Sequence, residues 1–165
     1  MTLIDDFKGM STAKWASKRS NCQKRKVGAA IFNKGNLISM GWNLCNPKDG
    51  MCGRLASKSG EDYELCGPPI HAEANAISNL LQYNPTFAGK RGNRMYVWGH
   101  DFSCDLCKKA IKTNKIKLVG VLANNSIYPW VAKVASKRRI IRRIIIGLSA
   151  FAIGTFGSYL LVSIL

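Results

Sequence analysis

Four residues of this chain have the side chains of a zinc site: three could bind a zinc ion, and the fourth is a carboxylate close enough to contact a water bound to that ion. His71 offers an imidazole, and Cys104 and Cys107 offer two thiolates in a Cys-x-x-Cys pair. One nitrogen and two sulfurs leave the fourth position of a tetrahedral zinc ion open for water. Glu73, two residues after His71, is placed to accept and return the protons of that water. The set predicts a zinc-dependent hydrolase in which Glu73 is the catalytic proton carrier.

The predicted positions of these residues strengthen that interpretation. His71 directly precedes an expected helix, and Cys104 opens another, so the two thiols of the Cys-x-x-Cys pair face the same way within one turn. The free N–H groups at a helix start favour the thiolate form that a metal needs. His-x-Glu together with Cys-x-x-Cys is the pattern of zinc nucleobase deaminases, whereas either motif alone is weak. A closed structural zinc site is the alternative, but it would not need Glu73.

The rest of the chain up to residue 122 alternates between helical and extended patterns. We expect helices at 5–17, 72–83 and 104–113, and strands at 27–32, 37–42, 95–98 and 116–122. The turn at 33–36 joins the first two strands into a hairpin. Residues 43–70 are rich in Gly, Pro and Cys and show no period, which is typical of a long functional loop.

Charge and cysteine content narrow the class of partners. The chain carries 25 Lys and Arg against 9 Asp and Glu, for a net charge of +16, which favours anionic partners such as nucleotides, nucleic acid or anionic lipid. The first ten residues do not resemble a signal peptide. We therefore interpret the six cysteines as metal ligands or free thiols rather than disulfides.

The C-terminal residues predict a membrane anchor. Residues 144–165 contain no charge, and a helix of 22 residues is about 33 Å long, enough to cross a hydrocarbon core of about 30 Å. The preceding segment, 127–143, is basic and is expected to stay on the cytosolic side. We expect a domain at 1–126, a juxtamembrane segment at 127–143 and a transmembrane helix at 144–165. The chain is then a single-pass, tail-anchored membrane protein with its catalytic domain in the cytosol.

The chain resembles the deoxycytidylate (dCMP) deaminases of the cytidine deaminase superfamily over about residues 12–122. The motifs that carry the resemblance are residues 20–30, 41–43 and 71–77 and the Cys-x-x-Cys helix. The resemblance implies a three-layer α/β/α fold with a mixed central sheet, followed here by the C-terminal transmembrane helix. It implies a zinc hydrolase that converts a pyrimidine nucleotide, dCMP, to dUMP and ammonia. It also implies a homo-oligomer.

The resemblance assigns roles to individual residues. His71, Cys104 and Cys107 would bind the catalytic zinc, with Glu73 as the proton carrier. Substrate would be bound by Asn43 at the sugar, by the Ala72 N–H at the pyrimidine carbonyl, and by Lys24, Arg25 and Lys26 at the 5′-phosphate. A second, structural zinc is implied at Cys22, Cys52 and Cys66, with Cys45 or His100 as fourth ligand. The alternatives are a turn residue at Asn43, a solvated basic turn at 24–26, and free buried thiols.

The chain also departs from the family around the first zinc cysteine. Ser103 stands where the family has proline, and 100–102 differ from the usual residues of a loop that lines the base pocket. The last strand and helix expected after Leu122 are missing or replaced. Two alternative functions therefore stay open: a polynucleotide cytosine or adenine deaminase acting on single-stranded DNA or RNA, and a non-catalytic, membrane-anchored zinc protein.

Overall fold

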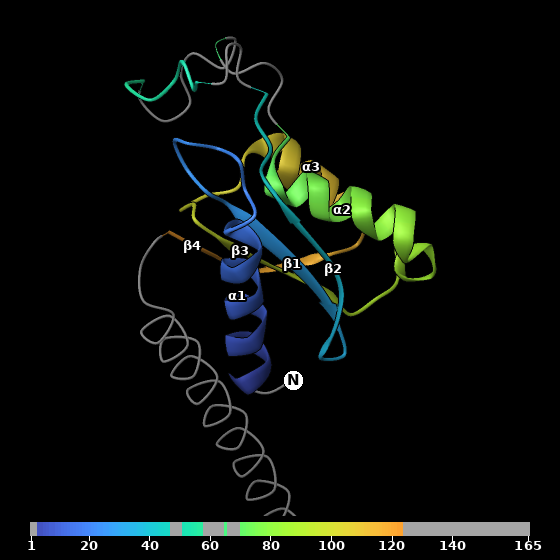
Figure 1. The fold of residues 1–165 in the computed structure, drawn as a ribbon. Coiled ribbons are helices and arrows are strands. Elements are labelled where there is room, and N and C mark those ends of the chain that lie inside the picture. The colour runs from blue at the N-terminus through green and yellow to red at the C-terminus, as the bar shows by residue number, and fades with distance from the viewer. Residues whose placement is uncertain (1–2, 47–50, 58–64, 66–69, 124–165) are drawn as a thin grey trace, which may run out of the picture. The chain divides into compact units, whose positions relative to one another are not determined.

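The computed structural model describes residues 3–46, 51–57, 65 and 70–123 (Figure 1). The chain divides into two units, Met1–Ile127 and Tyr128–Leu165, and the second lies outside the described residues. The predicted juxtamembrane segment and transmembrane helix belong to that second part. Within the described residues, no helix has both the length and the hydropathy needed to span a bilayer.

A mixed sheet of four strands forms the centre of the fold. Strands β1 (Gly28–Asn33) and β2 (Asn36–Trp42) pair antiparallel as the expected hairpin. Strand β3 (Asn93–Trp98) runs antiparallel to β1, and β4 (Lys117–Leu122) runs parallel to β3. The order is β2-β1-β3-β4, so the mixed sheet is confirmed.

The three predicted helices are confirmed with bounds shifted by at most two residues. They are α1 (Leu3–Ser17), α2 (Ala72–Tyr83) and α3 (Asp105–Thr113). A short 3₁₀ helix, η3 (Pro85–Phe87), follows α2 and was not expected from the sequence. Its proline stands in the first turn, where a missing N–H costs nothing.

Two glycines show how helices approach both faces of the sheet. A Cβ at Gly28 would collide with the backbone of α1 at Ala13 and Ser17. A Cβ at Gly41 would collide with the backbone of α2 at Ala76. Since Gly41 pairs with the residue after Gly28, these two positions point to opposite faces. Helix α1 therefore covers one face, and α2 and α3 pack together on the other (Figure 1).

A buried polar network fixes α1 to the sheet. The carboxylate of Asp6 is fully buried, and its Oδ1 accepts hydrogen bonds from Arg94 at 3.0 Å and from the Tyr96 hydroxyl at 2.8 Å. Burial and the Asp6 charge raise the pKa of Tyr96 far above its usual value, so the hydroxyl remains a donor. The pairing offsets the cost of burying a carboxylate, which is large without partners.

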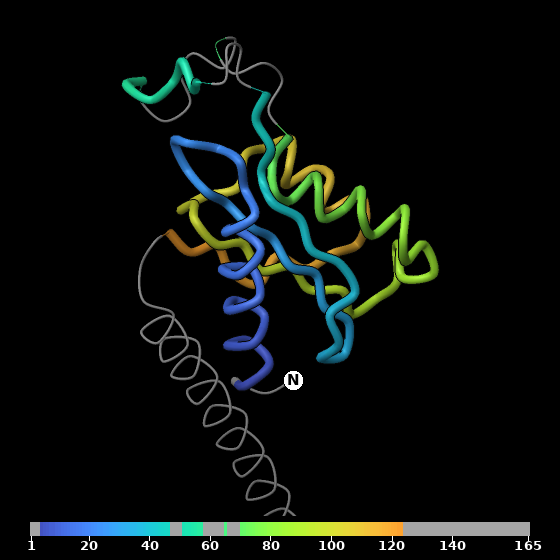
Figure 2. Tube along the Cα trace, viewed as in Figure 1, coloured from blue at the N-terminus to red at the C-terminus, as the bar shows by residue number. Residues whose placement is uncertain are grey.

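The topology brings the starts of α2 and α3 to one end of the sheet (Figure 2). Helix α3 begins shortly after β3 ends, and it connects β3 to its parallel neighbour β4. The long segment after β2 returns to the sheet through a pair of backbone hydrogen bonds between Leu44 and Ile70. This bridge places His71 beside the start of α3.

Candidate active site

The three predicted zinc ligands converge at the starts of α2 and α3. Nδ1 of His71 lies 3.4 Å from the sulfur of Cys104 and 3.4 Å from that of Cys107. A tetrahedral zinc holds nitrogen at about 2.0 Å and sulfur at about 2.3 Å, which separates a nitrogen ligand from a sulfur ligand by about 3.5 Å. The spacing of the three donor atoms, all within 4.8 Å of one another, therefore fits zinc.

The local structure of α3 prepares the two thiols for a cation. Cys104 is the N-cap of the helix, and its sulfur accepts the N–H of Cys107 at 3.4 Å. Burial, followed by the negative charge of Glu73, raises the pKa of the Cys107 thiol well above its usual value, which is opposite to the lowering expected from the helix start. A thiolate at Cys107 thus needs a bound cation nearby, which is the role that zinc fills.

Glu73 lies in the first turn of α2 with its carboxylate buried. Its Oε1 accepts a hydrogen bond of 2.7 Å from the hydroxyl of Ser103, which is also buried. Glu73 does not belong to the group of three residues that could hold a metal ion. Its burial beside that group therefore needs an explanation other than metal binding. A carboxylate held beside such a cluster has the position that proton transfer to and from a metal-bound water requires.

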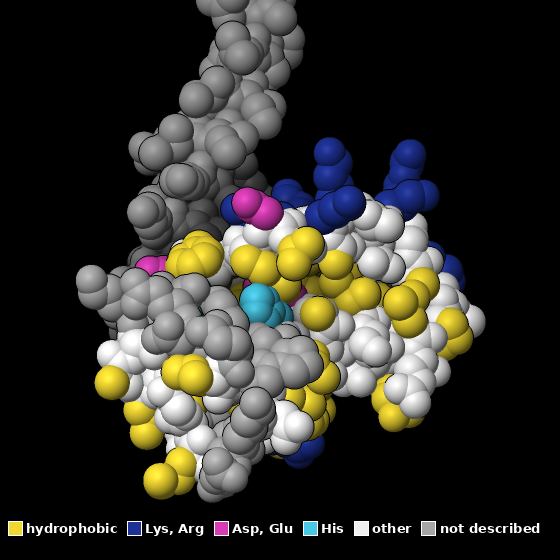
Figure 3. Space-filling model, turned by 90° about the horizontal axis from the view of Figure 1, so that it is seen from above, with side chains coloured by type: hydrophobic (Ala, Val, Ile, Leu, Met, Phe, Trp, Pro, Cys, Tyr) yellow, Lys and Arg dark blue, Asp and Glu magenta, His cyan; other side chains and the backbone are white. Residues whose placement is uncertain are grey.

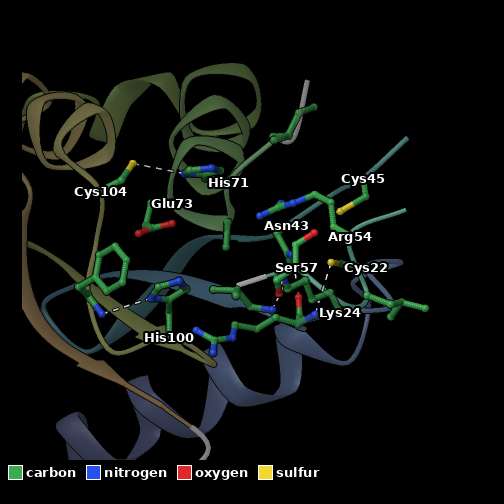
Figure 4. Close-up of a pocket in the computed structure, with 16 residues that line it drawn as sticks. Cys22, Lys24, Asn43, Cys45, Arg54, Ser57, His71, Glu73, His100 and Cys104 are labelled. Atoms are coloured by element: carbon green, nitrogen blue, oxygen red, sulfur yellow. Dashed lines mark hydrogen bonds between the residues drawn. The ribbon is translucent and has the colours of Figure 1, made fainter. Parts of the chain in front are cut away.

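A cavity of about 410 Å³ opens from this cluster and falls in the size range of small-molecule sites. It is lined by Cys22, Lys24, Arg25, Val27, Asn43, Cys45, Arg54, Leu55, Ser57, Ile70, His71, Ala72, Glu73, His100, Phe102 and Cys104. Figure 3 shows a hollow with a histidine side chain at its mouth, bordered by hydrophobic side chains. In Figure 4, the His71 and Cys104 pair occupies one end, and Lys24 and Arg54 lie toward the other.

His100 faces Glu73 across the cavity (Figure 4). Its Nδ1 accepts the N–H groups of Asp101 at 3.1 Å and Phe102 at 3.3 Å. Burial and the positive charge of Arg25 lower the pKa of His100, while the Asp101 carboxylate, whose Oδ1 lies 3.1 Å from Nδ1, opposes that shift. The ring of His100 packs edge-on against that of Phe102, with the ring centroids 4.3 Å apart.

The expected sugar ligand lines the cavity but also holds the backbone together. Oδ1 of Asn43 accepts the N–H of Val27 at 2.7 Å, and its Nδ2 donates to the carbonyl of Arg25 at 2.9 Å. The side chain thereby fixes the segment before β1 against the end of β2. Its remaining N–H and lone pairs are what a sugar hydroxyl could use.

The structure brings part of the predicted basic segment to the cavity and adds one residue that sequence reasoning missed. Lys24 and Arg25 line the cavity, whereas Lys26 is exposed and is not among the lining residues. Lys24 donates to the carbonyl of Ser57, and Arg25 faces Asp101 at 3.9 Å. The missed residue is Arg54, which is 8% exposed and lines the cavity. It lies in the long segment without periodicity, where no pattern could single it out.

The second predicted zinc site lies only partly within the described residues. Cys22 and Cys52 are buried and free, but Cys66 falls outside the described part of the chain. Burial raises the pKa of Cys22, but hydrogen bonds from backbone N–H groups and from Cys45 outweigh it and lower the pKa. Within the described ranges, His71, Cys104 and Cys107 form the one group that could hold a metal. The second zinc stays a prediction.

Comparisons with known proteins agree with this geometry. Residues 4–123 match the family described as the cytidine and deoxycytidylate deaminase zinc-binding region. The deoxycytidylate deaminase of Schizosaccharomyces pombe is 33% identical over 121 residues, which cover 68% of this chain and 33% of that protein. The deoxycytidylate deaminase of Saccharomyces cerevisiae is 36% identical over 73 residues, which cover 41% of this chain and 23% of that protein.

A solved structure shows the same fold with ligands. The dCMP deaminase from the cyanophage S-TIM5, crystallised in complex with dCMP and dUMP, superposes with a TM-score of 0.51 at 25% identity. The match covers 71% of this chain and 79% of the phage protein. The curated yeast relatives are longer, and the matched part of this chain spans a third of their length or less.

Proposed function

Because this chain belongs to the cytidine and deoxycytidylate deaminase zinc-binding family, we propose that it is a zinc-dependent hydrolase that converts dCMP to dUMP and ammonia. The observation that carries this proposal is the buried Glu73 carboxylate beside three residues spaced as zinc ligands. The dCMP and dUMP bound to the similar phage deaminase support the choice of nucleotide.

Different residues of this chain would bind the metal, transfer protons and hold the base. A zinc ion held by His71, Cys104 and Cys107 would supply a Lewis acid that lowers the pKa of a water molecule toward neutrality. Glu73 takes the protons that this water loses, giving one to N3 of the base and one to the departing amine. Water's oxygen forms a bond to C4, the C4–N bond breaks, and ammonia leaves. The Ala72 N–H lies in the first turn of α2, where no intrahelical acceptor is available, and lines the cavity, so it would donate to the pyrimidine carbonyl.

The far end of the cavity suits the 5′-phosphate. Lys24 and Arg54 both line it there (Figure 4), and guanidinium and ammonium groups are the usual partners of phosphate. Glu73 is the one carboxylate among the described lining residues, and it lies at the opposite, zinc end. The charge distribution therefore orients a nucleotide with its base at the zinc and its phosphate at Arg54.

We expect Arg54→Gln to lower kcat/KM for dCMP by about 10- to 100-fold, since a hydrogen bond to a charged group contributes about 1.5–3 kcal/mol. Activity on deoxycytidine, which has no phosphate, should change little. Steady-state ammonia release on both substrates measures the ratio. Lys34→Gln, an exposed lysine in the β1–β2 turn, is the charge-matched control. An equal loss on both substrates would show that Arg54 does not bind the phosphate.

One observation favours a second candidate function, a polynucleotide deaminase. Exposed lysines follow α3 from its start at the site to the start of β4, which lies beside the start of β3 at the opposite end of the sheet: Lys108, Lys109, Lys112, Lys115 and Lys117. Such a face attracts a phosphate backbone. However, single-strand binding also relies on stacked aromatic rings, and Phe102 is the only phenyl or indole ring among the described lining residues. Incubation with dCMP, cytidine, dCTP and single-stranded DNA distinguishes the two functions. Uracil product from the DNA alone would show that the substrate is a polynucleotide and not dCMP.

We also propose that residues 144–165 anchor the enzyme in a membrane as a single-pass tail, with residues 127–143 and the catalytic domain in the cytosol. The uncharged 22-residue stretch and the basic segment before it support this proposal. A homo-oligomer is proposed from the family resemblance.

Membrane extraction tests the anchor. The full chain should remain in the pellet after a carbonate wash and enter solution with detergent, because a spanning helix is held by hydrocarbon rather than by charge. Paired substitutions Ala152→Arg and Phe156→Arg, each costing about 2.5–3.5 kcal/mol near the middle of a span, should release it. Release of the unaltered chain by carbonate would refute the anchor.

A further inference from the structure

A buried hydroxyl holds the proposed proton carrier. The Ser103 side chain lies 2.7 Å from Oε1 of Glu73, and the two residues are 2% and 5% exposed. An ionised carboxylate only accepts hydrogen bonds, so the Ser103 hydroxyl is the donor. Among the described residues, no second donor bonds to this carboxylate. The contact is therefore a direct constraint on where the Glu73 carboxylate lies.

Ser103 does not itself reach the substrate cavity. Its neighbours Phe102 and Cys104 line the cavity, but Ser103 does not. Its side chain is directed at Glu73 from the buried side of the site. The side-chain contact by which this residue can influence the reaction is therefore the one to Glu73.

Two consecutive residues before α3, Ser103 and Cys104, contact the carboxylate and the imidazole at the start of α2. Ser103 bonds to Glu73, and the sulfur of Cys104 lies 3.4 Å from Nδ1 of His71. The segment from β3 to α3 therefore sets the metal ligand and the carboxylate at one fixed separation. A carboxylate that turned away would lose its hydrogen bond in a buried place, which is costly.

We propose that Ser103 is a positioning residue that commits proton transfer to a single oxygen of Glu73. Its hydroxyl occupies Oε1, which leaves Oε2 to accept the proton of water. When Oε2 carries the proton, Oε1 is a carbonyl oxygen and still accepts from Ser103. The hydrogen bond persists through the cycle, and the same oxygen takes the proton and returns it. This inference rests on the proposed role of Glu73.

Kinetics of Ser103→Ala test the proposal in the full chain. Removing the hydroxyl frees the carboxylate to rotate, and misplacement of a reacting group costs up to about 100-fold in rate. We expect kcat for dCMP to fall by about 10-fold or more while KM stays within about twofold, because Ser103 does not touch the substrate. Alanine is nearly the size of serine, so the variant should fold.

Ser39→Ala is the matched control. Ser39 is also buried, and its hydroxyl donates to the carbonyl of Ala76 at 2.7 Å, so it too binds helix α2. It is not a lining residue of the cavity. Both variants should lower the urea midpoint of unfolding to a similar extent, and only Ser103→Ala should lower kcat. Equal kcat values for the two variants would overturn the proposal.

Two measurements without turnover complete the test. Zinc content should remain at the wild-type level in Ser103→Ala, and its crystal structure should show the Glu73 carboxylate in more than one rotamer. Loss of zinc, or a single unchanged rotamer, would mean that Ser103 only supports the fold. A wild-type chain without deaminase activity would instead disprove the proposed function itself, and an active Glu73→Gln would disprove the proposed role of Glu73.

Discussion

Glu73→Gln is expected to leave zinc bound and to lower dCMP deamination by about 10²- to 10⁴-fold, the usual contribution of general acid–base catalysis. Glutamine nearly matches the shape of glutamate and can still accept the Ser103 hydrogen bond through its amide oxygen. It cannot take a proton from water. Ammonia release measures the rate, and metal analysis of the same sample measures zinc.

Asp105→Asn is a close control for that substitution. Asp105 is also a carboxylate in the first turn of a helix, next to the ligand Cys104, but it is exposed and paired with Lys108 at 2.9 Å. Its loss should leave the rate near that of the wild type. A Glu73→Gln variant that kept full activity would refute proton transfer by Glu73. A wild type inactive on every nucleotide and polymer would favour the non-catalytic zinc protein.

The secondary structure could be predicted because local patterns determine most of it. The apolar positions of α2, such as Ala76 and Leu80, repeat with a helical period and are fully buried. The turn before β2 contains Lys34 and Gly35, both at positive φ, as a tight hairpin requires. The η3 helix was missed because Asn84 and Pro85 signal only the end of α2.

The cluster of His71, Cys104 and Cys107, which could hold a metal ion, was also within reach of sequence reasoning, since the types and spacing of its residues are restrictive. The contacts that refine the site were not. Ser103 meets Glu73 and Asn43 meets Val27 only after the sheet has brought β1, β2 and the start of α3 together. Arg54 is placed by a segment without periodicity. Such tertiary contacts leave no trace in local pattern or composition.

Cys107→Ala is expected to abolish zinc binding and, with it, activity. The site has three protein ligands, so removal of one leaves two, and no other described His, Cys, Asp or Glu belongs to the cluster. Activity should fall at least as far as in Glu73→Gln, because neither the Lewis acid nor an acidified water remains. Zinc per chain, measured by mass spectrometry after dialysis, is the direct readout.

Stability separates metal loss from damage to α3. Zinc bound only by the folded chain contributes to its free energy of unfolding, so the melting temperature of the wild type should fall on chelation and that of Cys107→Ala should not. Ile111→Val, one turn further along the same buried face, costs about 0.5–1.5 kcal/mol by itself and should keep its zinc. A Cys107→Ala protein that retained stoichiometric zinc and activity would show that the metal binds elsewhere. The reaction proposed for this cavity would then be refuted.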